Sequence, residues 1–363
     1  MADIEGASCS VKPTGSHVVY SSASGQAKGP SRQCSAVGLV LLIAVLSGCV
    51  RQPGPALRAS TAESERLEAS TTTVLGTVEY EVLETLTVTN KGPGQPSKHN
   101  LWMALIQDIA PYQTVASIDI TPDSYRLVSD EYGNNYAEFD LADMEPGAAV
   151  PIEIRYRVAV NELSYDLSGC EGELPVFFTD SELHVESGNP QILELARELS
   201  KGQSTACGRV EAFYNHIGDH LVYSYNGANW GAQAALGPMG ADCTEYASLM
   251  TALSRAEEIP ARYLEGIRIL NEGAEQDALM EHAWLEVYLP GIGWTPMDPT
   301  LGRSSLSREA YFAYALPDRI VVTRGRNPST LRGASYFSHL YWPGAATKIQ
   351  VEDFEWDVTP VED

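Results

Sequence analysis

Hydrophobic residues change their spacing at residues 189–190, and this change limits what the two parts of the chain can fold into. From residue 71 to 188 apolar and polar residues alternate in short runs, as in TVEYEVLETLTVTN at 77–90. Such a period of two is typical of strands with one buried face. At Asn189-Pro190 a favoured helix N-cap meets a residue favoured in the first helical turn, and apolar residues then recur every three or four positions. The sequence therefore predicts an α+β fold in which the strands come first.

The strand-rich part contains a hairpin and further alternating runs. Residues 131–134 (EYGN) form a turn signal between two strand-like runs within 125–141. Another alternating run covers 146–160. Several short strands at this spacing predict an antiparallel β-sandwich of immunoglobulin-like type over residues 71–188. The sequence of this part contains no catalytic constellation, so we interpret it as a spacer or binding module.

The N-terminal residues have the pattern of a signal for export. The apolar run AVGLVLLIAVL at 36–46 has eleven residues, whereas a bilayer-spanning helix needs about 20, so the run is typical of a signal peptide. The residues that follow, Leu46-Ser47-Gly48-Cys49, resemble a bacterial lipobox. The resemblance implies a signal peptide over 1–48 and a lipid on Cys49 of a mature lipoprotein at the cell envelope. The alternative is a buried helix with an incidental cysteine.

The segment after the lipobox and the charge of the chain bear on its partners. Residues 49–70 are polar, with Pro and Gly near the start, and predict a tether. Val50 stands where an aspartate would favour inner-membrane retention in lipoproteins of this kind, which favours the outer membrane or the periplasmic face. The formal net charge of −24 repels nucleic acid and anionic lipid. We therefore expect membrane association through the lipid anchor and no nucleic-acid partner.

A cysteine stands at the start of a predicted helix in the second half of the chain. Within 240–266 (GADCTEYASLMTALSRAEEIPARYLEG) the apolar residues trace one helix face that stops before Pro260, and Cys243 opens this helix. A helix N-terminus stabilises negative charge and so lowers the pKa of a thiol, which favours a nucleophilic thiolate. The alternative is that Cys243 is a small core residue, because a cysteine beside an apolar face often is one.

Two further residue types of a nucleophilic site follow in order. His282 begins an alternating run that ends in a turn at Pro290-Gly291, and the return run carries Asp298. Counted back from this turn, Asp298 falls opposite His282 to within two positions. A carboxylate there can fix the imidazole tautomer while the other ring nitrogen faces the thiol. The cysteine, the histidine and the aspartate together predict nucleophilic acyl transfer.

These segments resemble the transglutaminase-like, papain-related superfamily. The matching motifs are Cys243-Thr244-Glu245-Tyr246-Ala247, Ile259-Pro260-Ala261-Arg262, His282-Ala283-Trp284 and Trp294-Thr295-Pro296-Met297-Asp298-Pro299-Thr300. The resemblance covers about 190–302 and implies a papain/transglutaminase-like catalytic domain over 189–302. It also implies that Cys243 is the nucleophile, His282 the general acid/base and Asp298 its orienting partner. Arg262 would then brace the strand beside the site.

An acyl-transfer site also needs donors for the developing oxyanion. The backbone N–H of Cys243 is the natural first donor, because the residue starts a helix. The resemblance implies an upstream side chain as the second donor, for which Trp230 and Gln233 are the candidates; either can instead line the cleft. The aromatic-rich residues 303–363 predict further strands that pack on the catalytic domain and close it.

The cysteine and histidine patterns predict a disulfide and no metal. The six cysteines contain no CxxC pair, so neither a zinc site nor a redox motif is expected. His216 and His220 lie four residues apart without an apparent third ligand, and we expect no cofactor. In the mature chain Cys49 is expected to carry the lipid and Cys243 to act as a thiol nucleophile. Cys170 and Cys207 are the two cysteines left, and an even pair in an oxidising compartment predicts a disulfide between them. Two unpaired buried thiols are the alternative.

The predicted activity is cysteine-dependent acyl transfer on amide bonds of a peptide or protein. Water as the acceptor would make the protein a peptidase or amidase, and an amine would make it a transglutaminase-type enzyme. For an envelope protein, hydrolysis or transpeptidation of a peptide or cell-wall amide is the favoured reaction. The alternative is a non-catalytic envelope binding or assembly module that retains the fold.

Overall fold

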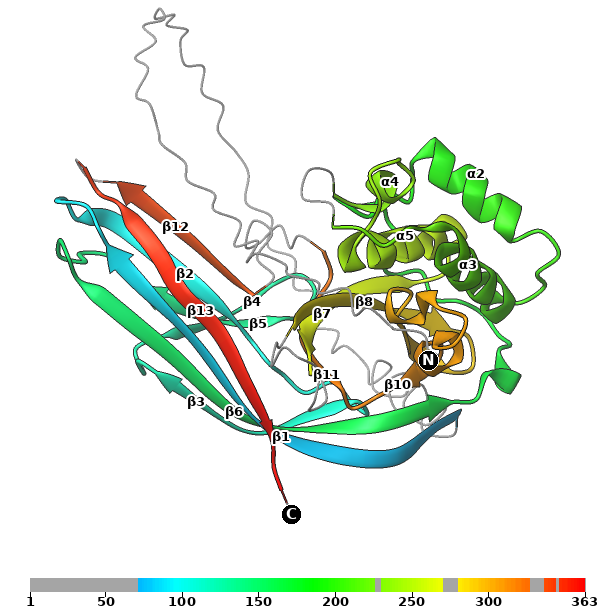
Figure 1. Ribbon diagram of the computed structural model, residues 1–363, viewed down its shortest axis with the longest axis horizontal. Coiled ribbons are helices and arrows are strands. Elements are labelled where there is room, and N and C mark those ends of the chain that lie inside the picture. The colour runs from blue at the N-terminus through cyan, green and yellow to red at the C-terminus, as the bar shows by residue number, and fades with distance from the viewer. Residues whose placement is uncertain (1–70, 226–229, 270–279, 327–335, 344–345, 363) are drawn as a thin grey trace, which may run out of the picture.

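The computed structural model describes residues 71–225, 230–269, 280–326, 336–343 and 346–362. The predicted signal peptide, the lipid-carrying Cys49 and the tether all lie outside the described residues. In the described chain an antiparallel β-sandwich stands beside a smaller sheet that is covered by helices (Figure 1). The predicted α+β fold class is thereby confirmed. Among these residues no helix is both long and apolar enough to cross a bilayer.

The sandwich consists of two antiparallel sheets whose buried faces share one core. One sheet has the order β10-β6-β1-β13, with β3 also paired to β6, and the other has the order β12-β2-β5-β4. Buried and exposed residues alternate along β1 and β6, as the period of two in the sequence predicts. The strands are β1 Thr72–Asn90, β2 Pro96–Leu105, β3 Gln113–Thr121, β4 Arg126–Ser129, β5 Asn135–Asp140, β6 Ala149–Tyr165, β10 Tyr314–Ala315, β12 Phe337–Pro343 and β13 Ile349–Pro360.

Strands β1 and β6 extend well beyond the sandwich. Figure 1 shows their far ends running beneath the helical part of the molecule, where Thr72 pairs with Tyr165. The short β10 joins them there, with Tyr314 opposite Ser164. We call the paired ends of these strands, residues 72–78 and 160–165, the arm. The arm supports the second domain from below in this view.

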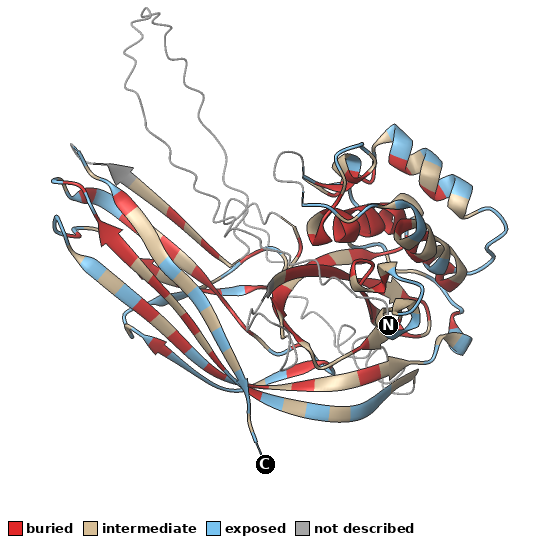
Figure 2. Cartoon of the chain, viewed as in Figure 1, coloured by how far each residue is buried: buried red, intermediate tan, exposed pale blue. Residues whose placement is uncertain are grey.

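The second domain is built on the antiparallel sheet β11-β7-β8-β9. Helix α5 lies against this sheet and is almost entirely buried, with α2, α3 and α4 around it (Figure 2). The sheet also contributes Leu264, Ile267 and Trp284 to the core of the sandwich. The elements are α2 Pro190–Leu199, α3 Ala206–His220, α4 Ala232–Ala235, α5 Cys243–Ala256, β7 Ala261–Arg268, β8 Met280–Leu289, β9 Gly293–Met297 and β11 Arg319–Arg324, with 3-10 turns η1 Leu167–Gly169, η2 Leu301–Arg303 and η3 Arg308–Tyr311.

Asp242 and Glu245 cap the N-terminus of helix α5 and fix its start at Cys243. The Asp242 side chain accepts the N–H of Thr244 at 2.9 Å, and the Glu245 side chain accepts the N–H of Asp242 at 3.1 Å. This reciprocal arrangement is a capping box, which satisfies N–H groups that have no partner within the helix. The helix ends at Ala256, before Pro260, as the sequence predicts. Cys243 is thereby fixed as the first residue of a rigid, buried helix.

The C-terminal residues divide between the two domains, which corrects the prediction that 303–363 packs on the catalytic domain. β11 does extend the sheet of the second domain by pairing with β7. β12 and β13, however, complete the sandwich by pairing with β2 and β1. Alternation along 349–360 predicts a strand but not its partner. The long β1 would otherwise leave a row of backbone N–H and C=O groups unpaired, which favours its pairing with β13.

Cys170 and Cys207 form a disulfide with their Cα atoms 6.2 Å apart, in the pairing that the sequence predicts. Cys170 follows η1, directly beyond the end of β6, and Cys207 lies in the first turn of α3. The disulfide therefore connects the arm to the helical layer of the second domain.

Candidate active site

Cys243 lies at the N-terminus of α5 and has 1% of its surface exposed. It packs with Ala247 on the same helix, with Tyr263 on β7 and with Ala283 on β8. Cys243 is not in a disulfide. Because the N-terminus of a helix carries partial positive charge, this position favours the thiolate form of a cysteine. Cys243 thus has the setting of a nucleophile next to the strand that carries His282.

His282 and Asp298 form a buried hydrogen-bonded pair. The distance from His282 Nε2 to Asp298 Oδ2 is 2.7 Å, and both side chains are almost fully buried. The pairing of β8 with β9 ends at Leu285 and Met297, and Asp298 follows directly. Continued by one residue, this register would place Asp298 opposite Trp284, two positions from His282. The turn at 290–291 therefore brings the two residues together within the offset that the sequence allows.

Asp298 is held by donors on both carboxylate oxygens. Oδ1 accepts the N–H groups of Thr300 at 3.1 Å and Leu301 at 2.9 Å. Oδ2 accepts Arg319 Nη1 at 2.7 Å in addition to His282. Burial alone would raise the pKa of Asp298, but the charges and hydrogen bonds of His282 and Arg319, together with the Leu301 N–H, lower it to about 2. Asp298 is therefore an ionised and firmly oriented carboxylate near neutral pH.

The ionised state of Asp298 has two consequences. His282 Nε2 must donate to it, so Nδ1 is the ring nitrogen that can exchange a proton with a thiol. In addition, a carboxylate whose pKa is depressed on folding stabilises the fold above its ordinary pKa of 3.8. That contribution is lost as the pH falls from this value towards about 2.

Besides Arg319, which contacts Asp298, another arginine, Arg326, lies near Cys243. The hydroxyl of Tyr263, which packs on Cys243, is hydrogen-bonded to Arg326 and to Glu265 Oε1, the latter at 3.0 Å. The Arg326 guanidinium also lies over the Tyr263 ring at 4.5 Å from its centroid. Arg326 is close enough to Cys243 for their charges to interact. This cation favours a negative charge on the sulfur, and the sequence motifs did not point to it.

Comparison with known proteins agrees with this geometry. Residues 193–299 match the model of the Transglutaminase-like superfamily, a span that includes Cys243, His282 and Asp298. These residues form a transglutaminase-like domain. Among curated proteins, "Uncharacterized protein YebA" of Bacillus subtilis (strain 168) is 24% identical over 143 residues, which are 34% of this chain and 19% of that protein. The chain thus matches about a fifth of that relative's length.

One solved structure supports the same fold. The chain resembles "a Putative Cysteine Protease from Cytophaga hutchinsonii" with a TM-score of 0.56 and 15% identity, over 80% of this chain and 93% of that one. At this identity the similarity shows a shared fold, and it extends well beyond the transglutaminase-like domain. The periplasmic domain of TgpA from Pseudomonas aeruginosa is 18% identical over 64% of this chain and 90% of that one, with a TM-score of 0.32.

Arg319 contacts Asp298 of the transglutaminase-like domain but lies outside every motif. It starts β11, about twenty residues beyond Asp298, and the structure buries it with 2% of its surface exposed. The only signal for it in the sequence is an arginine directly before the apolar run Ile320-Val321-Val322. A charge at the edge of an apolar strand predicts burial with a partner, but it does not name the partner.

The proposed oxyanion side chains lie in the segment that leads into α5. Trp230 is about half exposed and meets the ring of His184 edge-on at 6.0 Å between centroids. Gln233 is exposed on α4, and its backbone N–H donates to Glu186 Oε2 at 3.1 Å. These contacts hold the segment in place. A hydrogen bond from either side chain to an oxyanion stays a prediction.

The remaining polar candidates have structural contacts. Arg262 Nε donates to Glu286 Oε2 at 2.6 Å, and the guanidinium stacks over Trp294 at 4.0 Å, which braces β7 against β8 and β9. The rings of His216 and His220 stack at 4.1 Å between centroids. Within the described residues no group of three or more histidine, cysteine or acidic side chains has the geometry of a metal site.

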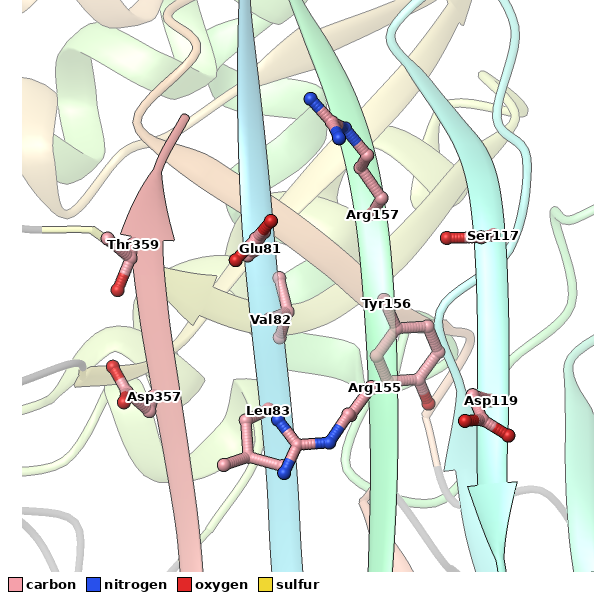
Figure 3. Close-up of a pocket in the computed structure, with 10 residues that line it drawn as sticks. All are labelled: Glu81, Val82, Leu83, Ser117, Asp119, Arg155, Tyr156, Arg157, Asp357 and Thr359. Carbon is pink, nitrogen blue, oxygen red and sulfur yellow. The ribbon is translucent and has the colours of Figure 1, made fainter. Parts of the chain in front are cut away.

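A hollow of about 410 Å³ lies on the exposed face of the sandwich sheet formed by β13, β1, β6 and β3 (Figure 3). It is lined by two rows of paired residues, one across Glu81 and Arg157 and the other across Leu83 and Arg155. Cys243, His282 and Asp298 are not in its lining. The hollow therefore belongs to the sandwich and not to the candidate active site.

Proposed function

We propose that the protein is a cysteine-dependent acyltransferase that acts on amide bonds of peptides or proteins, with Cys243, His282 and Asp298 as its triad. The observation that carries the proposal is the buried His282–Asp298 pair at 2.7 Å, beside a cysteine that starts a buried helix and packs on Ala283. A cysteine, an oriented imidazole and a carboxylate are the groups that nucleophilic acyl transfer requires. The match to the Transglutaminase-like superfamily over residues 193–299 supports the same reaction class.

The proposed reaction has two half-reactions. His282 Nδ1 accepts the proton of Cys243, and the sulfur forms a bond to the carbonyl carbon of the amide. The C–N bond then breaks as His282 returns the proton to the leaving nitrogen, which gives a thioester and a free amine. In the second half, water or an amine gives its proton to His282 and attacks the thioester. The C–S bond then breaks to release the acid or the new amide, and His282 returns the proton to the sulfur. The backbone N–H of Cys243 would stabilise the oxyanion in both halves, because it lies at the N-terminal end of α5, where the helix dipole favours negative charge.

The pH dependence of Cys243 alkylation by iodoacetamide tests this proposal without a known substrate. An ordinary thiol with a pKa of about 8.5 is less than about 1% ionised at pH 6. A thiolate paired with His282 stays reactive at that pH, so the ratio of the rates at pH 6 and pH 8.5 should be at least about tenfold higher than for an ordinary thiol. The ratio cancels the effect of burial, which slows both rates. Mass spectrometry of the Cys243 peptide gives the rates.

Two variants make the alkylation experiment decisive. His282→Ala should reduce the ratio towards that of an ordinary thiol, whereas His216→Ala, a histidine on α3 outside the site, should keep it. If wild type and His282→Ala gave the same low ratio, the protein would be better described as a non-catalytic envelope module that retains the fold.

We also propose that the protein is anchored at the cell envelope by a lipid on Cys49, because the apolar run at 36–46 is followed by a lipobox-like sequence. Cys49→Ser should then move the protein out of the membrane fraction or leave its N-terminus unprocessed. The matched change Cys34→Ser, upstream of the predicted cleavage site, should have no effect. Mass spectrometry of the N-terminus checks this. An unmodified chain that begins upstream of Cys49 would contradict the anchor.

A further inference from the structure

Arg319 shares one oxygen atom of Asp298 with His282. Its Nη1 and His282 Nε2 both lie 2.7 Å from Asp298 Oδ2. Together with the two backbone N–H groups on Oδ1, these donors occupy both oxygens of the carboxylate. Charge-assisted hydrogen bonds of this kind are short and directional. Rotation of the carboxylate is therefore restricted by Arg319 as well as by the backbone.

Arg319 is itself held on its other sides. Its Nε lies 3.1 Å from Asp318 Oδ1, an ion pair that is not aligned as a hydrogen bond. Its guanidinium lies over the rings of Trp284 and Tyr311, 5.5 and 5.3 Å from their centroids. With 2% of its surface exposed, Arg319 has little room for another rotamer. The position of its backbone therefore restricts where the Asp298 carboxylate can lie.

The sandwich holds that backbone at two points. The hydroxyl of Tyr112 donates to the carbonyl oxygen of Arg319 at 2.7 Å. The side-chain amide of Gln113 accepts the N–H of Val321 and donates to the carbonyl of Val321, both at 2.9 Å. Gln113 thereby takes the place of a neighbouring strand along the edge of β11. Both Tyr112 and Gln113 are buried, so these contacts are shielded from water.

We propose that Arg319 is a positioning residue of the triad, and that the sandwich sets its place by holding the backbone of β11 through Tyr112 and Gln113. This inference rests on the proposed acyl-transfer function. It gives the sandwich a role beyond that of a spacer, because the contact chain runs from Gln113 through β11 and Arg319 to Asp298. Such a chain matters because misplacement by about 1 Å can cost about 100-fold in rate.

The test uses the full-length protein and the pH 6 to pH 8.5 ratio for Cys243 alkylation by iodoacetamide. Arg319→Met should lower this ratio about tenfold relative to wild type, because the imidazole loses its oriented partner. Arg319→Lys, which keeps the charge but not the fork of donors, should restore part of it. Arg262→Met is the matched control, since Arg262 is a partly buried arginine in an ion pair with Glu286 outside the triad, and it should keep the wild-type ratio.

The direction of the change separates positioning from a simple charge effect. Removal of a positive charge beside His282 would by itself favour the imidazolium and raise the ratio. A raised ratio in Arg319→Met, or one equal to that of Arg262→Met, would overturn the proposal. If the alkylation ratio of the wild type were that of an ordinary thiol, the proposed acyl-transfer function would be contradicted. If instead Arg319→Met kept the wild-type ratio, the role of Arg319 alone would be contradicted, so the two outcomes are distinguishable.

A second pair of variants decides the matter if Arg319→Met does not fold. Gln113→Leu removes the amide that holds β11 next to Arg319. Asn134→Leu removes a similar amide, which binds the N–H and carbonyl of Arg324 at 2.9 and 2.7 Å, at the other end of β11. Gln113→Leu should lower the alkylation ratio more than Asn134→Leu at comparable thermal stability. Equal ratios in the two variants would contradict the role of the sandwich.

Discussion

Cys243→Ala should abolish the release of peptides or acyl products from envelope extracts, and His282→Ala should lower it by several orders of magnitude. Both changes remove a group that forms or breaks bonds in the proposed reaction, and triad members typically act as a unit. The measurement compares the products that wild type and each variant release from the same extract, by mass spectrometry. If Cys243→Ala retained wild-type activity on a substrate identified in this way, the assignment of the site would be wrong.

Asp298→Ala needs a different control from the other two changes. In the proposed reaction Asp298 orients His282 and takes no part in bond making or breaking, so its loss should be the mildest for activity. It also neutralises the buried Arg319, and removal of one partner of a buried ion pair often costs about 3–5 kcal/mol of stability. The alanine variant can therefore lose activity by unfolding. Asp298→Asn keeps the shape of the side chain, and its thermal denaturation curve should be recorded beside its activity.

Loss of the Cys170–Cys207 disulfide should lower the free energy of unfolding by about 2–4 kcal/mol. The disulfide closes a loop with a sequence separation of 37 residues, and a loop of this length gives a stabilisation of that order through the unfolded chain. Urea denaturation of the Cys170→Ser/Cys207→Ser double variant measures the change. Wild type reduced with dithiothreitol should match the double variant.

The position of the disulfide predicts which part of the protein is destabilised most when the disulfide is removed. It connects the end of the arm to α3, so its removal should loosen the helical layer before it affects the sandwich. Hydrogen exchange of α3 in the reduced protein should therefore increase more than that of β2 and β5. A urea midpoint identical to wild type would mean that the disulfide adds no stability in this setting.

Local signals in the sequence were sufficient for the elements that carry the site. Asn189 and Pro190 predicted the start of α2, and the residues around Cys243 predicted α5, because caps and helical spacing act within a few residues. The turn at 290–291 set the register of β8 and β9, which in turn set the distance between His282 and Asp298. Each of these inferences depends on neighbours in the chain.

The features that escaped prediction depend on residues far apart in the chain. Arg319 and Arg326 reach the site from β11 and its end, and no motif around either residue indicates Asp298 or Tyr263 as a partner. The same holds for β13, whose alternation fits an edge of either sheet. Pairing partners and buried ion pairs are decided by tertiary packing, and the residues next to each partner in the sequence do not indicate them.

Pairing of the first and last strands makes the sandwich a domain that is discontinuous in sequence. Tyr80 on β1 lies opposite Pro360 on β13, while the transglutaminase-like domain is inserted between β6 and β12. During synthesis the edge of β1 that pairs with β13 therefore stays unpaired until β13 has been made, because contacts so distant in sequence form late. During synthesis the inserted domain would fold on a platform that is still incomplete. Truncation before β12 would therefore harm the sandwich first, although every motif of the active site would still be present.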